Sequence, residues 1–175
     1  MDGTSLVKVG IFPSIGAGGG TEAEVTDLES VFSDLVRVET RLWNLVEMRL
    51  RAEHDLTLGR FETMSVIGRR GRCRPYDIAG DLGITVSGAS KLIDRIEAAG
   101  HCTRTANPAD GRSLLVELTT TGGVLLGQAR ITVRDVLSEH VTSALSPPAV
   151  QQLSASLADL RSAIYACDDA TGARQ

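Results

Sequence analysis

The segment from Pro75 to Gly122 reads PYDIAGDLGITVSGASKLIDRIEAAGHCTRTANPADGRSLLVELTTTG. Its pattern predicts a helix, a glycine turn, a second helix, a strand, a charged hairpin and a second strand, which is the layout of a winged helix-turn-helix. Ala79 and Gly83 lie four residues apart, so a small residue stands where the two helices approach and a glycine opens the turn. Five apolar residues are expected on the buried side of both helices: Ile78, Leu82, Ile84, Ala89 and Leu92.

The second predicted helix carries an outward polar face. A helix-turn-helix places its second helix in the major groove, so the sequence predicts DNA binding. Lys91 is the candidate for a major-groove contact and Arg95 for a phosphate or a base. Short hydroxyl side chains and free backbone amides at the N-terminal end suit phosphate or close base contacts. The DNA-binding residues predicted on this helix are Thr85, Ser87, Gly88, Ser90, Lys91 and Arg95.

Two strand-like runs, 102–105 and 113–119, flank the sequence NPADGR at 107–112. Asp-Gly is a strong hairpin signal, so the turn is expected at Asp110–Gly111. Arg112 at the tip is placed to reach a narrow minor groove, where the negative potential is enhanced. Asp110 is expected to orient Arg112 or to restrain the hairpin.

From about Leu28 to Ala166 the sequence resembles the MarR family of winged helix-turn-helix transcriptional regulators. The most specific parts are LIDRIEAAG (92–100) and DGR…VELTTTG (110–122), which look like that family's recognition-helix end and wing. The resemblance implies an obligate homodimer on double-stranded DNA, often released by a small-molecule or oxidant signal. The chain departs from the family at Lys91, where members often carry arginine, and at Gly111, where many carry a second wing arginine. Because lysine lacks the bidentate fork that reads guanine, these departures concern base preference.

The predicted fold is mainly α with a small β-hairpin wing. Residues 1–22 are Gly-rich and are interpreted as a disordered N-terminal lead-in. Residues 57–122 are interpreted as the winged helix-turn-helix lobe that binds DNA. Residues 23–56 and 123–167 are expected to form a helical dimerisation lobe, with Thr26 and Glu29 as a capping box at the start of its first helix. The last helix has an apolar stripe at steps of three and four. No other large body is expected to cover the outer helices, so the stripe is assigned to a second subunit: Val150, Leu153, Leu157, Leu160 and Ile164.

Composition excludes several classes of protein. Aromatic residues make up 3% of the 175, too few for the stacking platforms of a single-strand binder. No apolar run approaches the roughly 20 residues that span a bilayer, and no secretory signal is evident, so we expect a cytoplasmic protein without membrane contact. Residues 69–112 carry net +3 against −4 for the whole chain, which leaves −7 on the rest. This basic segment on an acidic body favours DNA as the partner.

Cys73, Cys102 and Cys167 show no metal-ligand spacing, and the first interpretation is three reduced thiols that pack as small hydrophobic groups. The alternative is a redox-sensing regulator, in which Arg72 and Arg74 lower the pKa of the Cys73 thiol.

The resemblance also implies an effector between the two lobes. The matching helices suggest a site for a small aromatic molecule, with Trp43 as a stacking group; alternatively Trp43 fills the core where two subunits meet. The candidate residues are Trp43, Met48, His54, Phe61 and Met64. No residue spacing supports a catalytic, metal or phosphate-loop site, so neither enzyme activity, metal nor cofactor is expected. A winged-helix protein-interaction module without DNA binding is the remaining alternative, and exposed positive charge on the second helix argues against it.

Overall fold

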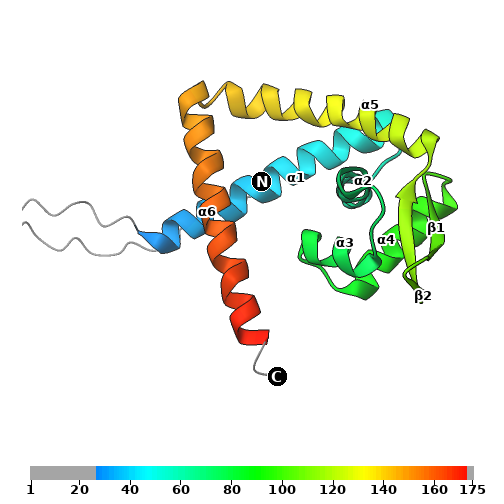
Figure 1. The fold of residues 1–175 in the computed structure, drawn as a ribbon. Coiled ribbons are helices and arrows are strands. Elements are labelled where there is room, and N and C mark those ends of the chain that lie inside the picture. Colours follow the sequence, from blue (N-terminus) through cyan, green and yellow to red (C-terminus); the bar gives the residue numbers. More distant parts are fainter. Residues whose placement is uncertain (1–26, 173–175) are drawn as a thin grey trace, which may run out of the picture.

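The computed structural model describes residues 27–172, without the side chains at positions 111, 112, 165 and 167–172. The described chain confirms the predicted fold class, mainly α with one β-hairpin (Figure 1). The prediction for residues 1–22 falls outside this range. The elements are α1 (Leu28–His54), α2 (Leu58–Arg70), α3 (Pro75–Leu82), α4 (Val86–Ala98), β1 (Cys102–Asn107), β2 (Asp110–Leu118), α5 (Thr120–Leu137), the π-helical turn η1 (Ser138–Thr142) and α6 (Pro147–Gly172).

The helix ends follow local capping chemistry. Thr57 caps α2, since its hydroxyl accepts a hydrogen bond from the Arg60 amide at 3.2 Å. The capping residue of α1 is Asp27, whose carboxylate accepts from the Glu29 amide at 3.1 Å; the predicted cap, Thr26, lies outside the described residues. Helix α2 continues through Gly68 to Arg70 and ends at Gly71, where φ is 76°.

The helix-turn-helix forms as the sequence predicts. Gly83 adopts φ 64° between α3 and α4, a left-handed conformation that glycine takes without strain. Ile78 and Ala89 are buried where the two helices meet. Ile84 was expected on the buried side and is instead 39% exposed, because it belongs to the turn between the helices.

The hairpin turn lies two residues earlier than predicted. β1 and β2 pair in an antiparallel ladder that runs from Cys102 opposite Leu118 to Asn107 opposite Asp110, so Pro108 and Ala109 form the turn. The buried Asn107 fixes it: its side-chain oxygen accepts from the Ala109 amide at 3.0 Å and its amide nitrogen donates to Ser113 Oγ at 2.9 Å. Asp110 and Gly111 therefore begin β2.

One hydrophobic core joins the helix-turn-helix to the neighbouring long helices. α5 lies alongside α1, with α2 between them and the hairpin (Figure 1). Val46 and Leu50 of α1 and Ala129 of α5 belong to the same core as α2, α4 and β2, and the predicted lobe boundaries stay a prediction. α6 turns away after η1 and its contacts with the other helices are few. The largest fully buried apolar side chains are Leu50, Leu56, Met64, Ile67, Ile78, Ile93, Ile96 and Val116.

Candidate DNA-binding interface

Helix α4 is held by its inner face and presents its outer face to solvent. Ala89, Ile93 and Ile96 are buried against the core, and their spacing turns Ser87, Lys91 and Arg95 outward. Thr85 caps the helix, its hydroxyl accepting from the Gly88 amide at 3.1 Å. A rigid inner face and an accessible outer face are what a recognition helix needs.

The structure brings six of the eight predicted DNA-binding residues together on α4. Lys91 and Arg95 are exposed, and neither forms an ion pair with any described residue. Thr85 and Ser87 are also exposed, whereas Gly88 and Ser90 are half-buried. The other two lie at the start of β2: Asp110 is exposed, and the side chain of Arg112 is outside the described residues.

An arginine that the sequence reasoning missed connects α4 to the wing. Arg104 of β1, 20% exposed in its side chain, forms a 2.6 Å hydrogen bond to Asp94 and a second ion pair to Glu97. Its backbone amide also donates to Glu97, at 3.2 Å. Arg104 thus neutralises two carboxylates that would otherwise lie beside the cations of α4. The sequence feature that could have indicated this contact is the three-residue spacing of Asp94 and Glu97, which places both carboxylates on one side of the helix.

The base of the wing is attached to the helix-turn-helix a second time. Cys73, just before α3, exchanges backbone hydrogen bonds with Val116 of β2, at 3.2 and 2.8 Å. Next to it, Arg72 donates to both carboxylate oxygens of Glu117, at 2.7 and 3.2 Å. These hydrogen bonds lower the pKa of Glu117. The wing base is therefore fixed both to α4 and to the α2–α3 connection.

Replacing Arg104 by methionine is expected to lower the free energy of unfolding by about 1–2 kcal/mol, because Asp94 and Glu97 keep their charges without a partner. Thermal unfolding followed by circular dichroism measures the loss. The matched control introduces Arg104→Met into a chain that already carries Asp94→Asn and Glu97→Gln, where the same change should cost far less. An equal cost in both backgrounds would contradict the ion-pair explanation.

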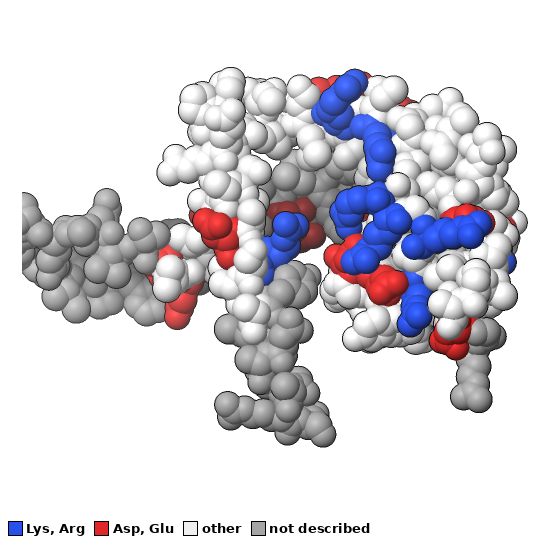
Figure 2. All heavy atoms as spheres, in the orientation of Figure 1, with Lys and Arg blue, Asp and Glu red and all other residues white. Residues whose placement is uncertain are grey.

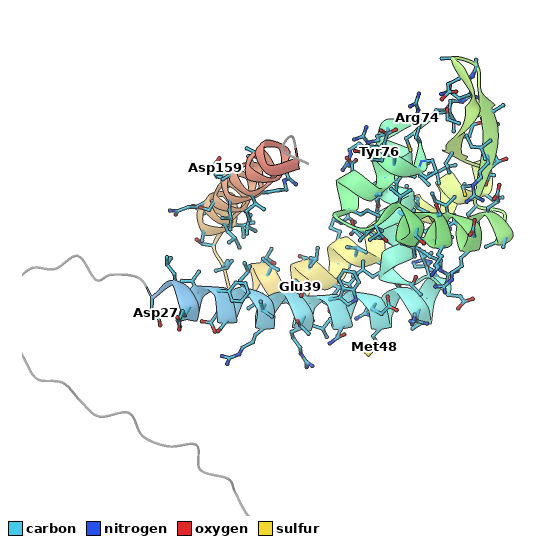
Figure 3. The ribbon with its side chains drawn as sticks, turned by 90° about the horizontal axis from the view of Figure 1, so that it is seen from below. Asp27, Glu39, Met48, Arg74, Tyr76 and Asp159 are labelled. Atoms are coloured by element: carbon cyan, nitrogen blue, oxygen red, sulfur yellow. The ribbon has the colours of Figure 1, made fainter. Side chains whose placement is uncertain are left out.

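Much of the basic run at 69–74 is neutralised in the folded chain. Arg69 and Arg70 both bind Asp81, at 2.7 and 2.5 Å, and Arg70 above all holds the pKa of that carboxyl at about 2. Figure 2 shows basic and acidic groups side by side over this part of the molecule. Arg74 and Tyr76 project from the start of α3 (Figure 3). The run is thus chiefly structural, and the unpaired cations of the described interface are on α4 and at Arg74.

The thiol environment contradicts the premise of a redox site at Cys73. Cys73 is buried, and this burial, followed by the nearby Asp77, raises the pKa of its thiol. The flanking Arg72 is engaged by Glu117. Burial also raises the pKa of Cys102, to about 11. Both thiols therefore stay protonated near neutrality and pack as small hydrophobic groups; the side chain of Cys167 is outside the described residues.

The five predicted effector residues do not share one pocket. Trp43 lines an apolar groove of about 660 Å³ between α1, α5 and α6, and Phe61 lines a neighbouring cavity of about 540 Å³ beside α5 and η1 that shares Val133 and Leu137 with the groove. Met64 is fully buried, and Met48 projects from α1 on the side away from α6 (Figure 3). His54 is half-buried with Nε2 2.8 Å from Thr132 Oγ1. Helical spacing in α1 and α2 put these residues on different faces.

No grouping of His, Cys, Asp and Glu among the described residues has the form of a metal site. Within 27–172, no helix has both the length and the apolarity needed to cross a membrane.

A helix-turn-helix followed by a hairpin packed against its second helix defines the winged helix-turn-helix class. Residues 56–114 match the MarR family. The chain is 27% identical to the multiple antibiotic resistance protein MarR of Escherichia coli over 99 residues, which cover 57% of this chain and 69% of that protein. Residues 56–114 therefore resemble a winged helix-turn-helix domain of the MarR family, whose members are transcription regulators and not enzymes.

Solved structures show the same fold. A mutant of E. coli MarR complexed with operator DNA superposes with a TM-score of 0.70 at 23% identity, covering 79% of this chain and 99% of that one. The transcriptional repressor CouR, bound to a 23-mer DNA duplex, gives a TM-score of 0.70 at 24% identity, covering 81% and 99%.

Proposed function

We propose that the protein is a homodimeric, sequence-specific DNA-binding transcription regulator that acts as a repressor. It binds a pseudo-palindromic operator with half-sites about one helical turn apart, α4 entering the major groove of each half-site and the wing, with Arg112, the adjacent minor groove. The observation that carries the proposal is the outer face of α4, where Lys91 and Arg95 are exposed and have no acidic partner among the described residues.

Two features of the interface support this function over an interaction module without DNA. The acids on α4 are bound by Arg104, so Lys91 and Arg95 remain available to phosphates. The wing base is fixed to α4, which keeps helix and hairpin at a constant separation, as binding in two adjacent grooves requires. The related MarR and CouR structures contain DNA, which agrees with this assignment.

A homodimer is supported by the apolar faces left open on α1 and α6. Leu35 and Val38 of α1 and Leu153 and Leu157 of α6 line the same groove and are each more than 40% exposed. A continuous apolar surface of this kind is unusual for a monomer. We propose that the second subunit covers this surface, including Trp43, which lines the same groove.

The effector of the proposed repressor is a small aromatic molecule in the other cavity, beside α5. Phe61, Val133, Leu137 and Val141 form its apolar lining, which suits a ring. Arg130 and Arg134 also line it and suit an acidic substituent. Of the residues predicted from the sequence, this placement retains Phe61.

Fluorescence anisotropy with labelled DNA from immediately upstream of the gene tests the proposal. Tight binding is expected to survive an excess of random duplex, and Lys91→Ala is expected to weaken it by about 1–3 kcal/mol, roughly tenfold to a hundredfold. Arg41→Ala, at an exposed arginine of α1, is the matched control and should leave binding unchanged. Binding lost to random competitor, or unaffected by Lys91→Ala, would count against specific readout by α4.

A further inference from the structure

Val86 is an aliphatic side chain that the core does not use. It is the first residue of α4 and is 44% exposed, whereas Ile93 and Ile96 of the same helix are fully buried. The residues that follow it are Ser87, Gly88 and Ala89, so the first turn of α4 has short, uncharged side chains. This turn can approach another surface more closely than the rest of the outer face, where Lys91 and Arg95 extend.

The position of Val86 on the helix is defined by its row. Val86, Ser90 and Asp94 are spaced by four residues and lie one above another along α4. At the far end of this row Asp94 is bound by Arg104 of the wing, at 2.6 Å. At the near end Val86 stays open to solvent. The row therefore begins with an exposed aliphatic group and ends at the wing.

The major groove offers one apolar group to such a side chain. Thymine presents its C5 methyl group there, whereas guanine, cytosine and adenine present hydrogen-bonding groups and no methyl group. The N-terminal residues of a recognition helix are those that contact base edges. We infer that Val86 selects thymine in each half-site by packing against the C5 methyl group, an inference that rests on the proposed DNA-binding function.

Deoxyuridine scanning tests this inference. In the operator duplex that the full-length protein binds, each thymine is replaced in turn by deoxyuridine, which pairs identically and lacks only the methyl group. At one thymine of each half-site the replacement is expected to weaken binding roughly fourfold, the effect of one buried methyl group. Val86→Ala should bind the thymine and uracil duplexes equally at that position.

Val124→Ala is the matched control, since Val124 is also an exposed valine, 58% against 44% for Val86, and lies on α5. This variant should keep the fourfold preference for thymine. Thermal unfolding shows that both variants are folded. The inference is overturned, with the proposed function intact, if no thymine replacement weakens binding by the wild type. It is also overturned if Val86→Ala shows the same loss of affinity on the uracil duplex as the wild type. Failure of the wild-type protein to bind any duplex specifically overturns both, and does so before the scan begins.

Discussion

Replacing Gly122 by alanine is expected to lower the free energy of unfolding by roughly 3 kcal/mol or more and the melting temperature by on the order of 10 °C. Gly122 is buried in the first turn of α5, where its amide donates to the hydroxyl of the capping residue Thr119 at 3.0 Å. A Cβ added at this position would lie 1.9 Å from the His101 carbonyl oxygen and 2.8 Å from its carbonyl carbon.

The cost is large because neither side of this contact is free to move. The His101 carbonyl also accepts from the Thr119 amide at 3.1 Å, and the His101 amide donates to the Ile96 carbonyl at 3.0 Å. His101 therefore belongs to the junction of α4 and β1. A methyl group there must separate α5 from that junction. Circular dichroism melting of purified Gly122→Ala measures the effect.

Gly127→Ala is the matched control, because Gly127 lies on the same helix, is exposed and has no atom within 4 Å of an added Cβ. Alanine favours helix over glycine by up to about 1 kcal/mol, so this variant should be as stable as the wild type or slightly more so. Equal stability of the two variants would show that the close approach at His101 relaxes without cost.

Leu157→Glu is expected to convert the proposed dimer into a monomer and to weaken operator binding by roughly a hundredfold or more. Leu157 is 42% exposed and lines the apolar groove between α1 and α6. A carboxylate at this position would have to be buried without a partner when a second subunit covers the groove. Operator affinity falls because two half-sites joined in one dimer bind with a high effective concentration, which a monomer lacks.

Light scattering after size-exclusion chromatography measures the change, from twice the 18.6 kDa subunit mass to that mass itself. Ala155→Glu adds the same charge on the opposite side of α6 and should leave both mass and affinity unchanged. A Leu157→Glu protein that remains dimeric would place the subunit contact elsewhere, and a wild-type monomer would remove the dimer from the proposed function.

The elements that could be read from the sequence are those with local causes. Pro75 and Gly83 mark helix ends through their own backbone chemistry, and each has the predicted role. The turn at Pro108–Ala109 was misplaced because a buried Asn107 bonded to Ser113 outweighs the Asp-Gly preference. The burial of Asn107 depends on how the wing packs, and the hydrophobic periodicity of the sequence does not predict that packing.

The candidate site divides in the same way. Helical spacing places Lys91 and Arg95 outward, because the apolar residues between them identify the inner face. The Arg72–Glu117 pair joins residues that are 45 positions apart, and no spacing rule connects them. Arginines beside Cys73 suggested a reactive thiol, yet burial and Asp77 raise its pKa, and both depend on the folded structure.

The double attachment of the wing base has a consequence for how DNA shape is sensed. With Arg104 bound to α4 and Cys73 paired to Val116, the root of the hairpin is held at two points, so we expect a displacement of its tip to reorient α4 as well. On a duplex whose minor groove is too wide for the wing, α4 would also be tilted in the neighbouring major groove. The width of the minor groove, which is small in A-tracts, would then alter how α4 contacts bases several base pairs away. The sequence preferences of the wing and of α4 should therefore not be independent.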